Sequence, residues 1–551
     1  MFTAAATQRD RRQLGGDPEW WRGAVIYQIY PRSFLDASGD GVGDLAGIAA
    51  KLDYVASLGV DAIWISPFFT SPMKDYGYDV ADYRGVDPLF GGLEDFDALL
   101  AAAHHRGLRV LLDAVLSHTS DQHPWFRESR VDRTGPKAEW YVWADPKAEG
   151  SPPNNWLSFF GGPAWEWDSR RRQYYQHNFL REQPDLNFHN PEVQEAMLGA
   201  LRFWLDRGVD GFRFDTVNMY FHDANLRDNP PIGDRRIRGM APENPFGMQA
   251  PIHNINRPET ERFAERIRAL MDEYDAATTV GEIGAALDTH AATVAYTAPG
   301  RLHMAYSFDF LERDVGPPVI RRAVEAMGVA AGSWPCWAFS NHDVERVLSR
   351  WEMERRPDRA GPMLVALLAS LRGTACLYQG EELGLPEAHV PFDKLQDPYG
   401  VRFWPEVKGR DGCRTPMPWS SAARHGGFTD GEPWLPCPPE HAARAVSVQE
   451  GDPGSALSRT RAFLAWRRRQ PALIRGDLVF RDAPDGVVAF TRRHEGASLF
   501  CAFNLGETEA RLPAPAALRA QEAAGFEGRI EGNEIVLPPS EALFAADEGE
   551  A

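Results

Sequence analysis

Apolar positions near the N-terminus follow a helical period that ends at a glycine and continues into a short apolar run. The helical stripe stops at Gly59, and glycine suits the left-handed turn that closes many helices. Residues 60–66 (VDAIWIS) then have the length and the Val and Ile content of a strand. The stripe consists of Leu45, Ile48, Leu52, Val55 and Leu58. We therefore expect one helix followed by one buried strand.

The same unit occurs twice more along the chain. The second stripe leads to a strand at 108–113, and the third leads to a strand at 209–215. The third helix also has Asn190 as N-cap and Pro191 at its first position. The stripes and their closing glycines are Leu93, Phe96, Leu99, Leu100, Ala103 and Gly107, then Val193, Met197, Leu201, Trp204 and Gly208. Repeated units of this kind predict parallel strands.

Five further apolar runs bring the number of predicted strands to the eight that a closed barrel needs. These runs are 24–30, 277–283, 302–310, 335–343 and 374–380. Parallel strands buried on both faces are continuously apolar, as these are. A doubly wound open sheet is the alternative, but no GxGxxG motif opens the first unit. We predict an α/β fold with a (β/α)8 TIM barrel.

Three parts of the chain depart from the barrel pattern. The stretch after the third strand is too long for a loop and is rich in Trp, Pro, Asn and Gly, which predicts a subdomain inserted at the barrel mouth. A polar, Pro-rich connection at 218–258 is expected to border a pocket. Alternating segments at 486–493 and 498–505 predict a C-terminal antiparallel β domain. The predicted division is barrel at 1–113, inserted subdomain at 114–189, barrel again at 190–470, and β domain at 471–551.

Composition narrows the classes of partner. A formal net charge of -19 disfavours nucleic acid and anionic membranes, which points to small neutral substrates. No apolar run approaches the ~18 residues of a membrane span, and charges in the first residues argue against a signal peptide, so we expect a cytoplasmic protein. The 5 cysteines are odd in number and unevenly spaced, which is typical of reduced thiols. The expected oligomeric state is a monomer or a homodimer.

Ionisable residues gather at the carboxyl ends of the predicted strands, where barrel enzymes carry their catalytic groups. Any one of them alone is as easily a helix cap or a surface ion pair. Together at one rim they repel one another, and such clusters serve to shift pKa values. The residues are Asp113, His118, Arg213, Asp215, Glu282, His342 and Asp343.

Cleavage of a glycosidic bond requires one carboxylate that attacks the sugar carbon and one carboxyl that protonates the leaving oxygen. Arg213 precedes Asp215 by two residues on one strand, so both side chains point the same way and Arg213 can keep Asp215 ionised. Glu282 has no Arg beside it in sequence, so a raised pKa is expected for it. We predict Asp215 as nucleophile, Glu282 as general acid/base, and a bell-shaped pH profile.

Several motifs resemble the α-amylase superfamily, glycoside hydrolase family 13, from about Trp20 to Trp419. LLDAVLSHTS, QPDLNF, GVDGFRFDTVN, VGEI and FSNHD correspond to its sequence regions in order and spacing. QIYPRSFLDASGDGVGDL, YGYDVADY, YQGEELGL and GRDGCRTPMPW resemble the branch of α-glucosidases and oligo-1,6-glucosidases. The resemblance implies the same roles for Asp215 and Glu282, and makes Asp343 the third acid, which binds sugar hydroxyls.

The resemblance also implies how the terminal glucose is held. Phe160 and Phe179 are expected to wall the site. In this branch a Thr after the nucleophile, here Thr216, goes with α-1,4 linkages and a Val with α-1,6 linkages; the alternative is that Thr216 is an ordinary β-branched strand residue. The residues expected to bind the sugar are Asp75, Tyr78, His118, Arg213, His342 and Arg410.

A metal loop is predicted after the first strand, because oxygen-bearing residues alternate there as in calcium loops. Its ligands are expected from Asp36, Ser38, Asp40, the Val42 carbonyl and Asp44. The twelfth position is Gly47 and not Glu, so the loop is no EF-hand, but it resembles the structural Ca2+ or Mg2+ site of the glucosidase branch. An Asp/Gly turn without metal is the alternative. Ser117 replaces the Asn that helps many amylases to bind another calcium, which puts that site in doubt.

These patterns predict an exo-acting, retaining α-glucosidase that acts on maltose and short α-glucosides. A covalent glucosyl intermediate on Asp215 and transfer of glucose to alcohols are expected, and no organic cofactor is. The alternatives are an oligo-1,6-glucosidase or a sucrose-cleaving or isomerising enzyme of the same family. A non-catalytic barrel subunit is a further alternative, but such chains lose the catalytic acids that this one keeps.

Overall fold

A computed structural model of the chain describes residues 16–233, 237, 240–328, 333–515 and 518–547. The expectation about the first residues of the chain falls largely on 1–15, outside the described part. Within the described residues, no helix is long and apolar enough to cross a membrane.

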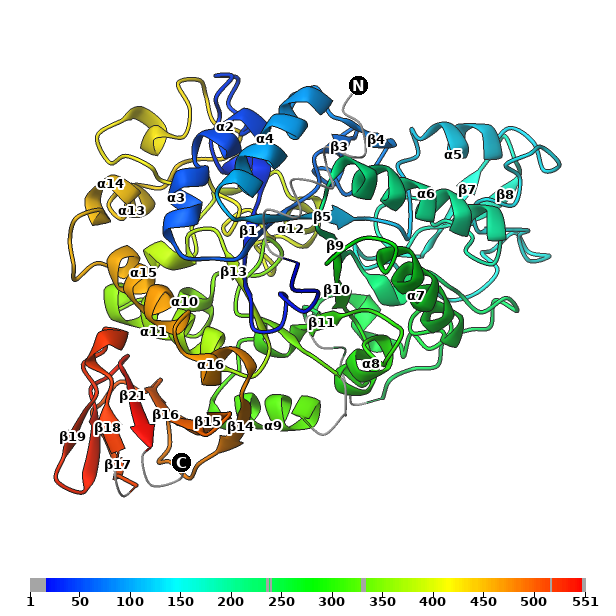
Figure 1. The fold of residues 1–551 in the computed structure, drawn as a ribbon. Helices are drawn as coiled ribbons and strands as arrows, with labels where there is room; N and C mark the ends of the chain where they lie inside the picture. Colours follow the sequence, from blue (N-terminus) through cyan, green and yellow to red (C-terminus); the bar gives the residue numbers. More distant parts are fainter. Residues whose placement is uncertain (1–15, 234–236, 238–239, 329–332, 516–517, 548–551) are drawn as a thin grey trace.

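Eight parallel strands form the barrel at the centre of Figure 1, as predicted. They follow the order β11-β10-β9-β5-β2-β1-β13-β12, and a parallel bridge between Ala305 and Pro335 joins the two end strands. The eight strands therefore form a nearly closed barrel, which excludes the open-sheet alternative. The strands are β1 (Val25–Ile29), β2 (Ala62–Ile65), β5 (Arg109–Ala114), β9 (Gly211–Phe214), β10 (Thr278–Ile283), β11 (Met304–Ser307), β12 (Cys336–Ala338) and β13 (Thr374–Tyr378).

Helices surround the barrel and bury the outer face of its strands (Figure 1). The helix that begins after Asn190 ends at Gly208, which has a left-handed φ of 107°. The single helix expected at 45–58 is wrong in detail: Lys51, with φ -109° and ψ 8°, divides it into two, although its apolar stripe stays buried across the break. The helices are α2 (Leu45–Ala50), α3 (Leu52–Ser57), α4 (Leu93–His105), α6 (Pro191–Arg207), α7 (Pro258–Met271), α8 (Thr289–Tyr296), α9 (Pro317–Gly328), α10 (Val347–Arg350) and α11 (Pro357–Ser370).

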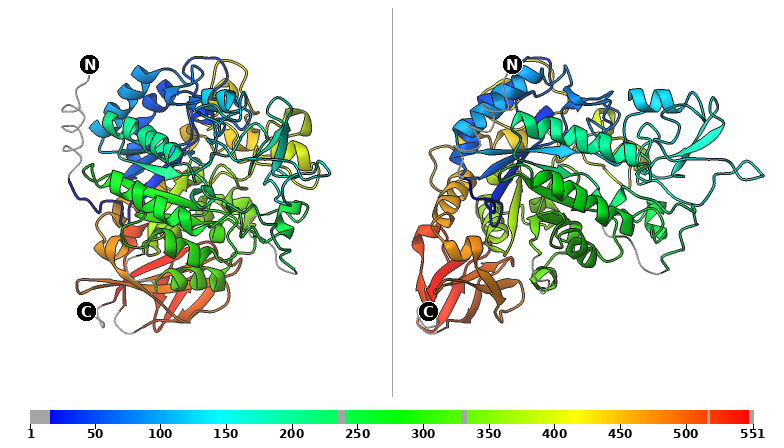
Figure 2. Two further views of the ribbon diagram at one scale, coloured as in Figure 1. Left: turned by 90° about the vertical axis from the view of Figure 1, so that its right-hand side faces the viewer. Right: turned by 45° about the vertical axis from the view of Figure 1, so that its right-hand side comes forward.

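The predicted insertion after the third barrel strand is a small structured subdomain. It contains α5 (Pro124–Ser129) and a sheet of β6 (Trp143–Ala144), β8 (Gln173–Gln176) and β7 (Trp165–Asp168). A bridge between His118 and Asp185 joins its first and last segments, so its polar residues are held at the carboxyl ends of the barrel strands. Figure 2 shows the subdomain projecting on the side of the barrel away from the C-terminal sheets.

Antiparallel sheets complete the C-terminal part, also as predicted. The larger sheet has the order β14-β15-β16-β21-β18, and the smaller one β17-β20-β19. The exact domain limits stay a prediction. The remaining elements are β3 (Phe69–Thr70), β4 (Asp82–Val86), α12 (Pro398–Phe403), α13 (Pro439–Ala442), α14 (Val446–Gln449), α15 (Ala456–Arg467), α16 (Pro471–Arg475), β14 (Asp477–Phe480), β15 (Val487–His494), β16 (Ala497–Asn504), β17 (Ala510–Pro513), β18 (Leu518–Ala520), β19 (Arg529–Glu531), β20 (Glu534–Leu537) and β21 (Ala542–Asp547).

Candidate active site

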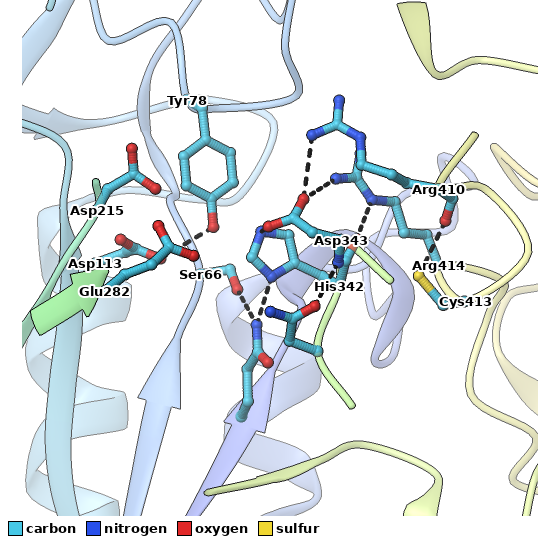
Figure 3. A network of polar contacts seen from close by, with 12 residues as sticks. Ser66, Tyr78, Asp113, Asp215, Glu282, His342, Asp343, Arg410, Cys413 and Arg414 are labelled. Atoms are coloured by element: carbon cyan, nitrogen blue, oxygen red, sulfur yellow. Dashed lines mark hydrogen bonds and ion pairs between the residues drawn. The ribbon is translucent and has the colours of Figure 1, made fainter. Parts of the chain in front are cut away.

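Arg213 lies at the centre of a cluster of carboxyl groups at the end of the barrel strands. Its Nη1 is 2.8 Å from Asp113 Oδ1 and 2.7 Å from Asp215 Oδ1, and its Nη2 is 2.6 Å from Glu282 Oε1. Arg213 is 1% exposed, because it points into the barrel from β9. Figure 3 shows how closely the three acids lie. One planar guanidinium thus holds three carboxyl groups in fixed positions.

The contact between Arg213 and Glu282 was not expected from the sequence, which places the two residues far apart. Strands β9 and β10 are neighbours, with Arg213 opposite Val280 in the register, so Glu282 follows two residues further along β10. Glu282 has no Arg beside it in sequence, but the fold places Arg213 against it, so the raised pKa expected for Glu282 arises from burial and not from the lack of a cation.

Burial raises the pKa of both proposed catalytic acids. Asp215 is raised to about 7 and Glu282 to about 7, although Arg213 lowers both. Burial likewise raises the pKa of Asp113 to about 6. The sequence suggested that Arg213 would keep Asp215 ionised at neutral pH. The effect of Arg213 is smaller than that of the lost hydration around Asp215, because its single charge is shared by three buried acids. At neutral pH the cluster therefore keeps a proton, which an acid/base pair requires.

Thr216 connects the two acids through its backbone and not as a strand residue. It follows the end of β9 and has φ 39° and ψ 49°, a left-handed conformation that is rare for β-branched residues. Its N–H donates to Glu282 Oε2 (3.0 Å), and its Oγ1 donates to Asp215 Oδ2 (3.3 Å). Strained conformations of this kind persist where the surroundings enforce them, often at functional sites.

Asp343 lies across the site and is held by two further arginines. Its Oδ1 is 3.1 Å from Arg410 Nη1 and 2.9 Å from Arg414 Nη2 (Figure 3). Burial opposes its ionisation, but His342, Arg410 and Arg414 hold the pKa of Asp343 below its usual range. Arg410 also contacts Asp75 at 2.9 Å. Asp343 is therefore an ionised acceptor beside Asp215 and Glu282, whose pKa values are raised.

Ring stacking and hydrogen bonds orient the residues around these acids. Tyr78 stacks on His342 with a centroid distance of 5.2 Å, and its hydroxyl donates to Asp113 Oδ2 (3.0 Å). His118 Nε2 is 2.9 Å from the carbonyl of Tyr78, which can only accept, so Nε2 carries the ring proton. Nδ1 is then an acceptor for the Ser117 hydroxyl at 2.9 Å. The Tyr78 carbonyl thus fixes the tautomer of His118, and burial lowers the pKa of His118 to about 4, which keeps it neutral.

These residues surround a cavity of about 180 Å³. All predicted catalytic and sugar-binding residues line it except Arg213 and His342, which are fully buried. A larger cavity of about 830 Å³ adjoins it and shares Asp343, Tyr399 and Arg410 with it. The predicted residues that line the smaller cavity are Asp75, Tyr78, His118, Phe160, Phe179, Asp215, Thr216, Glu282, Asp343 and Arg410.

Several participants in the site were not predicted from the sequence. Gln183 lies in the QPDLNF motif and Arg414 in the GRDGCRTPMPW motif. Both motifs were recognised, so their polar side chains could have been predicted as members of the site. Asp397, 2.7 Å from Arg410 Nη2, belongs to no recognised motif. Tyr306 lies in a predicted strand, but its hydroxyl reaches the site only through the register with Glu282. The connection at 218–258 does border the cavity, through Met219 and Met240.

The predicted metal loop is stabilised by its own hydrogen bonds. Asp36 accepts the N–H groups of Gly39 and Gly41 (both 2.7 Å), and Asp44 accepts that of Gly47 (2.6 Å) as N-cap of α2. Among the described residues, no group of three or more His, Cys, Asp or Glu side chains is arranged to hold a metal ion. The oxygen-only set of Asp36, Ser38, Asp40, Val42 and Asp44 suits a hard cation in kind, so a metal here stays a prediction.

Comparison with known proteins places this site in a family. Residues 28–476 match the alpha amylase catalytic domain. A probable alpha-glucosidase of Rhizobium meliloti (strain 1021) is 54% identical over 97% of this chain and 98% of its own, and an oligo-1,6-glucosidase of Heyndrickxia coagulans is 36% identical over 90% and 94%.

Solved structures agree with this placement. The alpha-glucosyl transfer enzyme XgtA superposes with a TM-score of 0.94 at 56% identity, covering 96% of this chain and 99% of its own. The trehalulose synthase MutB from Pseudomonas mesoacidophila MX-45 superposes with a TM-score of 0.86 at 31% identity and the same coverage. This chain therefore belongs to the α-amylase superfamily, glycoside hydrolase family 13, and is a glycosidase of its α-glucosidase and oligo-1,6-glucosidase branch.

Proposed function

We propose that this enzyme is an exo-acting, retaining α-glucosidase that hydrolyses the terminal α-1,4 bond of maltose and short α-glucosides. The observation that carries the proposal is the pair of Asp215 and Glu282, held by one guanidinium at a small cavity. Their raised pKa values near 7 allow one to be ionised while the other is protonated at neutral pH.

The reaction proceeds in two steps. Asp215 Oδ attacks the anomeric carbon while Glu282 gives its proton to the leaving oxygen, which forms a glucosyl ester and releases the aglycone. Glu282, now a carboxylate, takes a proton from water, and the resulting hydroxide equivalent displaces Asp215 from the sugar. Arg213 steadies the negative charge in both steps. Asp343, Arg410 and His118 bind the sugar hydroxyls.

The shape of the site supports exo action on short substrates. The cavity of about 180 Å³ is small for an oligosaccharide, whereas the adjoining one of about 830 Å³ has room for the aglycone or an acceptor. An acceptor alcohol there competes with water for the glucosyl ester, so we include transglucosylation in the proposal. The similarity to an alpha-glucosyl transfer enzyme favours this side activity.

The α-1,4 preference depends on Thr216, whose hydroxyl lies beside the nucleophile. An oligo-1,6-glucosidase and a sucrose-cleaving or isomerising enzyme remain the alternative functions, because the similar proteins include an oligo-1,6-glucosidase and a trehalulose synthase. We further propose a structural Ca2+ or Mg2+ in the loop of Asp36 and Asp44, a monomer or homodimer, a cytoplasmic location, and no partner among nucleic acids or membranes.

Proton NMR of the sugar released from maltose tests the proposal. We expect α-glucose as the first product, and an Asp215→Asn variant that is folded and inactive. Initial β-glucose would overturn the retaining mechanism. Release of glucose from isomaltose or sucrose but not from maltose would show that the enzyme has a different substrate, and it would leave the proposed roles of the two acids unchanged.

A further inference from the structure

Tyr306 lies on β11 directly beside the proposed acid/base. The register of β10 and β11 pairs Glu282 with Tyr306, so both side chains emerge at the same level of the barrel. Tyr306 is 2% exposed and packs in the barrel interior with Trp64, at a ring-centroid distance of 6.5 Å. Packing fixes the ring, so the place of its hydroxyl is set before any substrate binds.

The hydroxyl of Tyr306 has a single possible direction for its proton. It is 3.2 Å from Arg213 Nε and 2.9 Å from Arg213 Nη2, and both of these groups can only donate. They occupy the acceptor side of the oxygen. Its O–H is therefore directed at Glu282 Oε1, at 2.9 Å. Burial raises the pKa of Tyr306 well above its usual value, so the hydroxyl keeps this proton in the pH range of the reaction.

The two oxygens of Glu282 consequently differ. Oε1 accepts the Tyr306 hydroxyl and forms an ion pair with Nη2 of Arg213 at 2.6 Å, so a hydrogen-bond donor and a positive charge both face this oxygen and disfavour a proton on it. Oε2 receives one donor, the N–H of Thr216 at 3.0 Å, and has a position left. The proton that Glu282 donates therefore resides on Oε2.

We propose that Tyr306 is a positioning residue for the acid/base. Its hydroxyl bonds to Oε1 and holds the carboxyl group of Glu282 in place, so that Oε2 carries the proton that is transferred. This inference rests on the proposed role of Glu282. In the first step Oε2 gives its proton to the leaving oxygen, and the carboxylate that forms is stabilised by the Tyr306 hydroxyl. In the second step Oε2 takes a proton from the attacking water, and the original state returns.

A Tyr306→Phe variant tests this role through the pH profile. Phenylalanine keeps the packed ring but removes a donor to ionised Glu282, so the pKa of Glu282 rises. We expect the basic limb of kcat/KM for maltose to move upward by about one pH unit, and kcat to fall about tenfold, because one hydrogen bond to a charged group is lost. With an aryl glucoside, whose leaving group needs little protonation, the fall should be smaller.

Tyr141→Phe is the matched control. It removes another buried tyrosine hydroxyl, one that contacts Thr119 at 2.8 Å in the inserted subdomain, and it should leave the basic limb in place. A folded Tyr306→Phe enzyme with an unchanged basic limb would overturn the inference.

Two more variants keep the outcomes separate. If Tyr306→Phe does not fold, 3-fluorotyrosine at position 306 keeps the ring and makes the hydroxyl a stronger donor, so the basic limb should move downward; no movement refutes the proposal. Glu282→Gln tests the proposed function by itself. An active Glu282→Gln enzyme on maltose would show that the acid/base is another residue, whatever Tyr306 does.

Discussion

At the scale of the residue, Arg213 uses all three of its nitrogens in contacts within this site. Nη1 donates to Asp113 and Asp215, and Nε and Nη2 donate to the Tyr306 hydroxyl. Nη2 also forms an ion pair with Glu282. A lysine offers one compact charge and cannot reproduce this planar set of contacts. The protonation of the three acids is therefore a property of the cluster and not of any one of them.

The pH dependence follows from this cluster. Activity requires ionised Asp215 and is lost as the pH falls below its pKa; it requires protonated Glu282 and is lost as the pH rises above its pKa. Both values lie at about 7, so kcat/KM for maltose should be bell-shaped with a maximum near neutral pH. Rates measured in overlapping buffers at constant ionic strength check this, and a flat profile from about pH 5 to 8 would contradict it.

At the scale of the element, the backbone of the turn between β9 and η2 (Val217–Met219) positions Glu282 more directly than the side chain of Thr216 does. Thr216 reaches Glu282 through its backbone N–H, and it does so only in a left-handed conformation. Parallel neighbouring strands bring Asp215 and Glu282 to the same rim of the barrel. The turn determines how the two carboxyl groups are positioned relative to each other, because Thr216 contacts both of them. The strand-residue alternative for Thr216 is thereby excluded.

Two substitutions separate the backbone from the side chain at this turn. Thr216→Pro removes the N–H and forces a negative φ, so kcat/KM for maltose should fall about 100-fold or more. Thr216→Gly accepts the left-handed conformation without strain and keeps the N–H, so its loss should stay within about tenfold. Circular dichroism checks that both variants fold. A proline variant as active as the glycine variant would show that the N–H of residue 216 does not position Glu282.

At the scale of the whole molecule, the predicted metal loop connects distant parts of the chain. Asp36 Oδ2 accepts the hydroxyl of Thr429 (2.5 Å), and the carbonyl of Gly41 accepts the N–H of Trp434 (3.0 Å). The loop thus connects the segment after β1 to the segment that follows the GRDGCRTPMPW motif. That motif contains Arg410 and Arg414. A cation bound there would strengthen this link without touching the substrate.

Thermal unfolding with and without Ca2+ or Mg2+ tests that site. A bound cation stabilises only the folded state, so Tm should rise with its concentration and fall with a chelator, while kcat at low temperature stays unchanged. Asp40→Ala should abolish the effect, since Asp40 is exposed and is a predicted ligand. Glu128→Ala, which removes another exposed acid, is the control. Equal Tm values in chelator and in saturating cation would rule the site out.

Much of the architecture was accessible from local pattern. Apolar runs such as 108–113 and 209–215 identified all eight barrel strands, because strands buried on both faces leave an unbroken apolar signal. The carboxyl ends of parallel strands share one rim, so the order of the strands and acids along the chain was enough to predict Asp215, Glu282 and Asp343 together. The break at Lys51 could not be predicted, since the apolar stripe reports burial and not continuity of the helix.

The sequence by itself determined the barrel, the inserted and C-terminal parts, and the set of acids at the rim. Only the tertiary structure decided which groups touch: Arg213 on Glu282, the hydroxyl of Tyr306 on the same carboxyl, and Ser117 on His118. The reason is physical. Periodicity and capping act over a few neighbouring residues, whereas pKa values and proton directions depend on contacts of about 3 Å between strands that are far apart along the chain.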